Sequence, residues 1–356
     1  MRDRLVDPIS RNERLRADSV TFRPHAKKGL VWIGLAVSAV FAYLAVRGVD
    51  LDQVWSALGR CRWWTLVPAF ALLVLANLVR AWRWQLQFTP ASRPRYWPAL
   101  NALLIGTFFN NVLPARAGEA AQVVALRRSS RTSLAETAAT VLAGRVWDVL
   151  SVLVMLFCLA AWFPPVSWLR AAVYLAIGLV VGLVFVLVSG RRLLRWVLRP
   201  LTRLPFVTRD QTDSAATAAW RGLVSVRRPV PALVAFTLST VSWVLFGLSN
   251  WFVLEGFSLG LSPLAGILVS IALSLAMILP SAPASIGVFE AAVLVALKPY
   301  GVPKPDALSA GLVLHALNLF PYLVAGVVCL RLESAGRRYA PHGAAGPGGP
   351  AGLQNR

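Results

Sequence analysis

Stretches without a charged side chain alternate along this sequence with short clusters of basic residues. Most of the stretches hold about 20 residues, the length that a helix rising about 1.5 Å per residue needs to cross a hydrocarbon core of about 30 Å. None of them alternates apolar and polar residues as the strands of a membrane barrel do. The uncharged stretches are 29–46, 63–79, 96–115, 149–169, 171–190, 229–254, 256–289 and 307–330. The pattern predicts an all-α polytopic membrane protein, because backbone groups in lipid are satisfied only within helices or closed barrels.

About six full spans are expected, and the basic clusters between them mark the cytoplasmic side. The expected spans are 30–46, 63–80, 137–161, 171–190, 230–253 and 307–330. Outside the membrane, the sequence predicts a basic cytoplasmic N-terminal segment (1–28), a cytoplasmic loop (191–228) and a disordered cytoplasmic tail rich in Gly, Pro and Ala (333–356). Both termini are then cytoplasmic, in the inner membrane of a bacterium.

The segment 97–127 does not fit this count of spans. Pro114 and Gly118 interrupt it, and the seven uncharged residues Ala120–Leu126 that follow Glu119 are too few for a second crossing. The basic residues on both sides of the segment look cytoplasmic. We therefore expect a re-entrant helical hairpin that enters from the cytoplasm and returns to it.

A second re-entrant hairpin is expected over 263–298, this time entered from outside. Pro280 and Pro283 interrupt a long uncharged run there, and a hairpin keeps the last span ending in the cytoplasm. Many secondary transporters form a binding site at the middle of the membrane from two such hairpins in inverted arrangement. Free backbone N–H groups at the half-helix N-termini suit an anion such as a phosphate. The alternative is that Pro and Gly only kink ordinary spans.

Composition supports the membrane prediction and excludes other classes. The chain has 57% hydrophobic and 14% charged residues, which is too apolar for a soluble domain of 356 residues. Its net charge of +21 comes with no nucleic-acid-binding motif and suits anionic lipid headgroups better than DNA. The three cysteines show no metal-binding spacing, so neither a metal nor another cofactor is expected.

Five ionisable residues fall where the pattern places lipid or protein interior. Each is costly there unless it is paired or faces a polar cavity. Arg145 and Asp148 are three residues apart on one helix, so a local ion pair is a sufficient explanation for both. The five residues are Arg116, Glu119, Arg145, Asp148 and Glu290. For Arg145 and Asp148, a functional role is the alternative to the local ion pair.

The other candidates also carry two interpretations. Glu119 follows Gly118 in the first turn of a helix, where the macrodipole stabilises a carboxylate. Glu290 could accept hydrogen bonds from free amides of its hairpin, and His315 and Asn318 could join helices. Arg116 has only Glu119 as a local acid, and its guanidinium could bind a lipid phosphate through two parallel hydrogen bonds.

Taken in order, these motifs resemble those of one family. Asn110-Asn111-x-x-Pro114-x-Arg116-x-Gly118-Glu119, then Arg145-x-x-Asp148, then Pro283-x-Ser285-x-Gly287-x-x-Glu290 resemble the transmembrane domain of the lysylphosphatidylglycerol synthetase/flippase family. Each motif is short, so the specificity lies in their order and spacing. The resemblance covers roughly residues 30–332. Ala284 and Ser285 stand where many relatives carry Gly, which leaves the closeness of backbone approach at this tip open.

The resemblance implies a flippase-like transmembrane domain (29–332) that moves a phosphate-headed lipid or lipid-linked intermediate between leaflets. No aminoacyl-transferase domain accompanies it, so we expect no enzyme. The expected partners are membrane lipids and a separate lipid-modifying enzyme, and no nucleic acid. The expected substrate-binding residues are Asn110, Asn111, Arg116, Glu119, Arg145, Asp148, Ser285 and Glu290, with Pro114, Gly118, Pro283 and Gly287 shaping the hairpin backbone. The alternatives are a membrane-embedded lipid-headgroup or polyprenyl-phosphate transferase and a non-transporting partner in an envelope complex.

Overall fold

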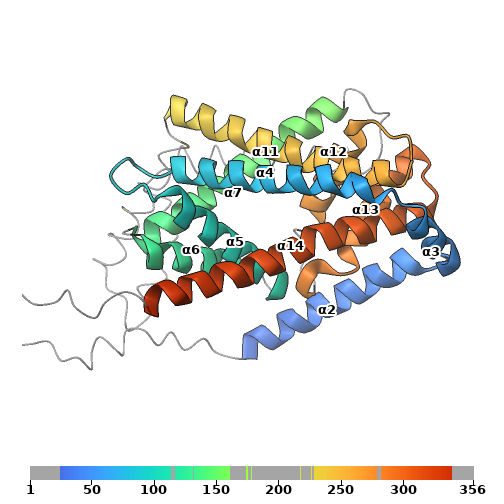
Figure 1. The fold of residues 1–356 in the computed structure, drawn as a ribbon, viewed down its shortest axis with the longest axis horizontal. Coiled ribbons are helices and arrows are strands. Elements are labelled where there is room, and N and C mark those ends of the chain that lie inside the picture. The colour runs from blue at the N-terminus through green and yellow to red at the C-terminus, as the bar shows by residue number, and fades with distance from the viewer. Residues whose placement is uncertain are drawn as a thin grey trace, which may run out of the picture.

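All regular secondary structure that the computed structural model describes is helical (Figure 1). The described residues are 25–113, 117–130, 132–160, 228–277, 279 and 282–338, with the isolated positions 174, 178, 217 and 226. Within them, five helical segments are long and apolar enough to cross a membrane, namely Trp63–Leu86, Leu134–Leu159, Pro229–Gly256, Pro283–Tyr300 and Lys304–Ser334. The chain is therefore a polytopic α-helical membrane protein.

Most of the described helices overlap the uncharged stretches. In chain order they are α2 (His25–Val46), α3 (Leu51–Gly59), the short 3-10 helix η1 (Trp63–Thr65), α4 (Leu66–Leu86), α5 (Tyr96–Val112), α6 (Gly118–Ser129), α7 (Leu134–Ala160), α11 (Pro229–Gly256), α12 (Pro263–Ala276), η4 (Pro283–Ser285), α13 (Val288–Leu297), η5 (Lys298–Tyr300) and α14 (Lys304–Arg338).

Long helices form the frame of the molecule. α4, α7, α11 and α14 run roughly along its long axis, and α4 packs against α11 over much of its length (Figure 1). The contact between α11 and α12 is close because a Cβ on Gly266 would overlap the backbone oxygen of Gly247. The largest buried apolar cluster joins α11, α12, α13 and α14 to parts of α4 and α7. Small residues therefore let the backbones approach, as is typical of packed membrane helices.

The first expected hairpin corresponds to α5 and α6, which pack against each other. A Cβ on Gly118 would overlap the backbone oxygen of Gly106, so only glycine permits this spacing of the two helices. α6 begins at Gly118, whose backbone N–H donates to Asn110 Oδ1 at 3.0 Å. The end of α5 thus satisfies the first amide of α6. Pro114 and Arg116 lie outside the described residues.

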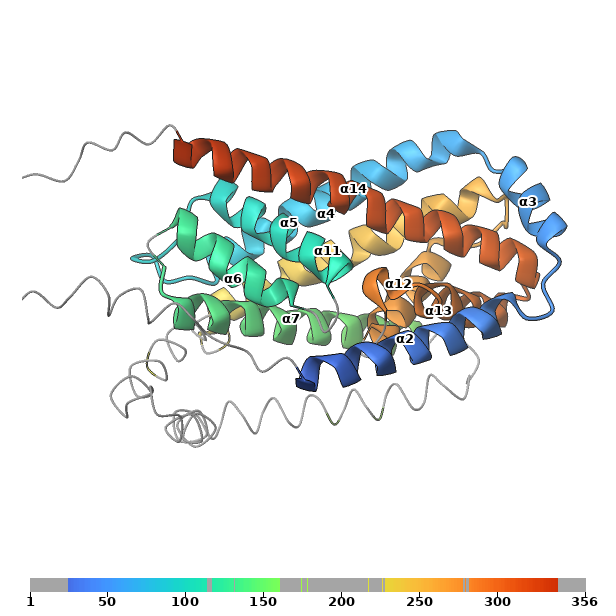
Figure 2. The ribbon, with the colours of Figure 1, turned by 90° about the horizontal axis from the view of Figure 1, so that it is seen from below.

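The second expected hairpin corresponds to α12 and α13, joined through η4. The two helix pairs approach from opposite ends of the molecule, and η4 contacts α5 where they meet (Figure 2). The connection is strained at Ala284 and Ser285, which have φ of 59° and 58°, whereas Gly287, with φ of 85°, has a conformation that glycine adopts readily. On its other side, Ser38 Oγ of α2 accepts from Ala282 N at 2.8 Å.

Some boundaries differ from the expected ones. The second span continues to Leu86, because Arg80 and Arg83 are held inside the protein by an acidic partner and do not end the helix. The last helix continues to Arg338, so the first residues of the expected tail are helical. The expected span 171–190 and loop 191–228 lie outside the described residues, apart from isolated positions.

A buried hydrogen bond joins α4 to α14, and its loss is expected to have a small effect. Asn77 Nδ2 donates to Leu73 O at 2.7 Å and to Tyr322 Oη at 2.8 Å. We expect Tyr322→Phe to lower the free energy of unfolding by about 1 kcal/mol or less, because Asn77 keeps its bond to Leu73. Thermal unfolding in detergent measures this. The control is Tyr43→Phe, since the Tyr43 side chain is exposed on α2; equal shifts for both variants would contradict the expectation.

Candidate functional site

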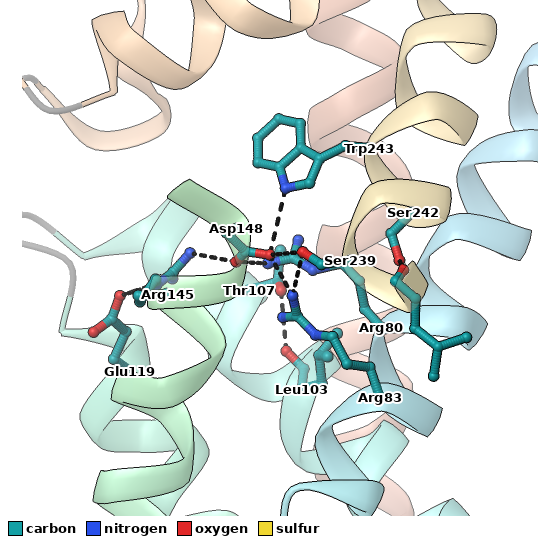
Figure 3. A network of polar contacts seen from close by, with 11 residues as sticks. Arg80, Arg83, Leu103, Thr107, Glu119, Arg145, Asp148, Ser239, Ser242 and Trp243 are labelled. Atoms are coloured by element: carbon teal, nitrogen blue, oxygen red, sulfur yellow. Dashed lines mark hydrogen bonds and ion pairs between the residues drawn. The ribbon is translucent and has the colours of Figure 1, made fainter. Parts of the chain in front are cut away.

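An ion-pair network lies between α4, α6, α7 and α11, and we call it the central network (Figure 3). Its charged members are Arg80 and Arg83 on α4, Glu119 on α6, and Arg145 and Asp148 on α7. The network contains three guanidinium groups and two carboxylates, so it carries one excess positive charge.

Asp148 is the centre of the network. Its Oδ1 lies 2.6 Å from Arg83 Nη1, and its Oδ2 lies 3.3 Å from Arg80 Nη2 and 3.7 Å from Arg145 Nη1. Two groups on α11 also donate hydrogen bonds to Asp148 Oδ1: Ser239 Oγ at 3.2 Å and Trp243 Nε1 at 3.4 Å. The expected local pair with Arg145 is present, but it is the longest of the three ion pairs. Asp148 chiefly balances arginines from another helix.

The arginines differ in burial, and Arg80, at 24% exposed, lies between the other two. The Arg83 side chain is 5% exposed and also donates to Ser239 Oγ at 2.6 Å, so its role is to hold helices together. Arg145 is 43% exposed and pairs with Glu119, which is 30% exposed, at 2.7 Å and 2.9 Å. Arg145 and Glu119 therefore form the accessible side of the network. Glu119 lies in the first turn of α6, as the sequence predicts.

A second polar cluster holds the tip of the α12–α13 pair, and we call it the tip cluster. His315 Nδ1 on α14 lies 2.6 Å from Glu290 Oε1, and His315 Nε2 lies 2.9 Å from the carbonyl oxygen of Ala284. Glu290 Oε2 accepts from Gly287 N at 2.7 Å, which is the expected hydrogen bond to a free amide of the hairpin. The Phe289 ring stacks on the imidazole with centroids 4.5 Å apart. Both carboxylate oxygens of Glu290 are thus already engaged.

The expected site residues consequently fall into separate groups. Glu119, Arg145 and Asp148 come together in the central network, whereas Glu290 and Gly287 belong to the tip cluster. Three further members of the expected set lie at the ends of the helix pairs: Asn110 accepts from Gly118, Asn111 is half-buried near the end of α5, and Ser285 is buried in the strained connection that Pro283 begins.

Sequence reasoning missed Arg80 and Arg83, because it ended the second span at residue 80 and took the basic residues there to mark the cytoplasmic side. Together with Asn77 and the C-cap residue Gln87 they recur every three or four residues along a mostly apolar helix, which places all four on one face. A polar face of this kind within an apolar helix usually points into the protein. The spacing was therefore the available signal. Ser239 and Trp243 on α11 carried no comparable signal.

The residues present do not suggest a metal centre. In the part of the chain that the structure describes, no three His, Cys, Asp or Glu side chains gather as metal ligands would. The site instead offers guanidinium groups, of which that of Arg145 is the most exposed. Guanidinium groups bind anions, phosphate above all.

Comparison with known proteins agrees with this architecture. A family model described as the lysylphosphatidylglycerol synthase TM region matches residues 31–326 of the chain. The chain is also similar to the UPF0104 membrane protein MJ1078 of Methanocaldococcus jannaschii, with 23% identity over 225 residues, which cover 62% of this chain and 92% of that protein. The match to the family model spans both helix pairs and the residues of both polar clusters. The chain therefore belongs to the family of the lysylphosphatidylglycerol synthase transmembrane region.

Proposed function

We propose that this chain moves a phosphate-headed lipid, or a lipid-linked intermediate, from one leaflet of the membrane to the other. The observation that carries the proposal is the central network, with its excess positive charge and its half-exposed Arg145. A lipid headgroup crossing the membrane must exchange water for protein groups, and a guanidinium suits a phosphate through two parallel hydrogen bonds. The family membership supports the same class of function.

In this proposal α5–α6 and α12–α13 are re-entrant hairpins whose tips meet inside the membrane. The candidate span Pro283–Tyr300 has 18 residues only when the break at residues 284–287 is included, and its regular helix α13 has 10 residues and extends about 15 Å. With 14 residues, α12 extends about 21 Å. A hydrocarbon core of about 30 Å exceeds both lengths. The tip amides of Gly118, Ala282 and Gly287 find acceptors in Asn110, Ser38 and Glu290. Such satisfaction is required of a chain that turns in lipid.

The headgroup would enter at the accessible side of the network. Its phosphate would replace Glu119 as the partner of Arg145, while Arg83 and Asp148 keep the helices in place. The acyl chains would stay in the bilayer, because several apolar side chains at the tips are exposed: Val112, Leu113, Met277, Leu279 and Ile286. Arg116 belongs to the same proposal through its place in the sequence between α5 and α6.

The remaining parts of the proposal follow from the same site. The chain acts as a transporter and not as an enzyme, in the cytoplasmic membrane of a bacterium with both termini in the cytoplasm. A separate lipid-modifying enzyme would supply its substrate. Transport of a preformed lipid needs no reacting group, only a polar path.

The test is a leaflet-exposure assay in vesicles that contain the purified chain. Fluorescent anionic, zwitterionic and aminoacylated lipids are placed in one leaflet, and a membrane-impermeant quencher reports their movement. We expect protein-dependent movement of at least one of these phospholipids, which Arg116→Ala abolishes and Arg145→Gln reduces about tenfold or more, as loss of a charge-assisted contact would.

The matched control is Arg60→Gln. Arg60 is also an arginine in an ion pair, 3.7 Å from Asp306, but it lies at the end of α3, away from the central network (Figure 1). The Arg60→Gln variant should move lipid at the rate of the unmodified chain. Unchanged movement in both Arg116→Ala and Arg145→Gln would remove this site from the mechanism. If no lipid moves but a product forms when candidate donors are added, the chain is a transferase.

A further inference from the structure

The tip cluster has an unusual proton requirement. Ala284 contributes a carbonyl oxygen, which only accepts, so the 2.9 Å contact needs a proton on His315 Nε2. The 2.6 Å contact between Nδ1 and Glu290 needs a second proton between the two groups. A neutral histidine and an ionised glutamate hold one such proton between them. The two contacts need two protons, so the pair carries one additional proton. The complete cluster is therefore an imidazolium–carboxylate pair or its neutral equivalent.

We propose that His315 and Glu290 form a proton-binding site, and that loss of its proton to water unties the second hairpin tip from α14. When one proton is removed, one ring nitrogen of His315 loses its hydrogen. That nitrogen is then an acceptor facing another acceptor, which is the Glu290 carboxylate for Nδ1 and the Ala284 carbonyl for Nε2. One of the two contacts must then break. Any role of this proton in transport rests on the proposed function. The proton would then be a second ligand of the transporter, besides the lipid.

Within the described helices around the tip, no other charged side chain competes for this proton. His315 and Glu290 are 11% and 9% exposed. The elements packed around the tip are α2, α5, α12, α13 and α14. In the segments 29–46, 96–112, 263–297 and 307–330 of these elements, the sequence carries no Asp, Glu, Lys, Arg or His besides Glu290 and His315, and the remaining titratable side chains are Tyr43, Tyr96, Tyr322 and Cys329. The charge of the pair is thus set by its own proton.

The tip is built so that this contact decides its position. Ala284 and Ser285 both have left-handed backbone angles, which cost non-glycine residues about 1–3 kcal/mol each. The strained segment is held on one side by Ser38 of α2 and on the other by His315 of α14. Release of the Ala284 carbonyl removes this attachment to α14 while the strain remains. A tip that also contacts α5 would then move relative to the first hairpin.

The direction of the pH dependence follows from the proton count. At low pH the pair holds both protons and the tip is tied to α14. As the pH rises through the titration of the pair, one proton leaves and the tip is released. Glu290→Gln removes this dependence without removing the contacts. The glutamine amide can donate to His315 Nδ1 and accept from Gly287 N, while neutral imidazole keeps its Nε2 proton for Ala284.

The experiment is hydrogen exchange of the tip, residues 282–290, in the purified full chain in lipid nanodiscs between about pH 5 and about pH 9. Each rate is divided by the intrinsic exchange rate at the same pH. We expect protection in the unmodified chain to fall about five- to tenfold as the pH rises, the effect of one lost hydrogen bond. Glu290→Gln should stay protected throughout. Asn318→Ala, which removes a bond only to Leu314 O on its own helix, should behave like the unmodified chain.

Protection that does not depend on pH in the unmodified chain overturns the proposal, whatever the variants do. A pH dependence that persists undiminished in Glu290→Gln overturns it as well. The leaflet assay separates this result from the proposed function. A pH-dependent tip in a chain that moves no lipid would keep the proton site and remove the flippase, whereas lipid movement with an insensitive tip would do the reverse.

Discussion

Replacement of Asp148 by alanine is expected to cost about 3–5 kcal/mol of stability, because it leaves a buried guanidinium without a counter-charge. The Arg83 side chain is 5% exposed and its shortest ion pair is the one with Asp148, so it cannot turn to water. Glu119 does not compensate, since the ion pairs of its carboxylate in the structure run to Arg145. A loss of this size is a large share of the 5–15 kcal/mol that typically separates folded from unfolded protein.

The measurement is unfolding in detergent of Asp148→Ala, Arg83→Met and the double variant. If the arginine left behind causes most of the loss, the double variant will be more stable than Asp148→Ala alone. Coupling between groups in direct contact is typically about 0.5–3 kcal/mol. The Arg60→Gln variant serves as the control for an exposed ion pair, which contributes about 1 kcal/mol or less. Equal losses for Asp148→Ala and Arg60→Gln would show that the central network is not structural.

Gly287→Ala is expected to displace the second hairpin from α2. A Cβ at this position would lie 2.5 Å from Ser38 O and 2.6 Å from Ala42 N, and both atoms belong to the backbone of a helix that cannot easily move. Gly287 also has φ of 85° and ψ of −48°, which L-residues rarely adopt. Overpacking of this kind costs about 1–3 kcal/mol and strained backbone about 1–3 kcal/mol more.

Gly301→Ala is the matched control for this substitution. Gly301 has φ of 69°, but a Cβ there would meet nothing within 4 Å, so only the backbone strain is added. The difference in thermal unfolding between the two variants combines the contact with α2 and the greater backbone strain at Gly287, because Gly301 lies in the left-handed helical region (ψ of 18°) and Gly287 lies outside it (ψ of −48°). If Gly287→Ala and Gly301→Ala lose the same stability, the close approach of α2 to the tip is not needed for the fold.

The sequence predicts the helices well because lipid imposes a length on them. The uncharged stretches correspond to α2, α4, α7, α11 and α14, and the Pro and Gly interruptions correspond to the breaks in the two helix pairs. The ends of the helices were harder to predict, since a charged residue usually ends a membrane span. Arg80 and Arg83 do not, because a partner 65 residues or more away in the chain neutralises them. The spacing of these arginines indicates a face that points into the protein, but it does not identify their partner.

The candidate site could be predicted only in part for the same reason. Glu119, Arg145 and Asp148 stood out as charges within apolar stretches, and the structure brings them together. Their substrate role stays a prediction. Glu290 stood out equally, yet its oxygens are occupied by Gly287 and by His315, which the sequence offered only as contact between helices. Which buried charges meet depends on how the helices pack, and helix packing is not encoded in spacing along the chain.

The attachment of the second hairpin to two distant helices has a consequence for how the protein is made. Ser38, which caps the tip from α2, is synthesised long before the hairpin, whereas His315 follows Glu290 by 25 residues. During translation, α12 and α13 therefore emerge with their connection unfinished. The Ala284 carbonyl and the Glu290 carboxylate must find temporary partners in water or in the insertion machinery. α14, which leaves the ribosome after α12 and α13, is thus the helix that completes the turn between them.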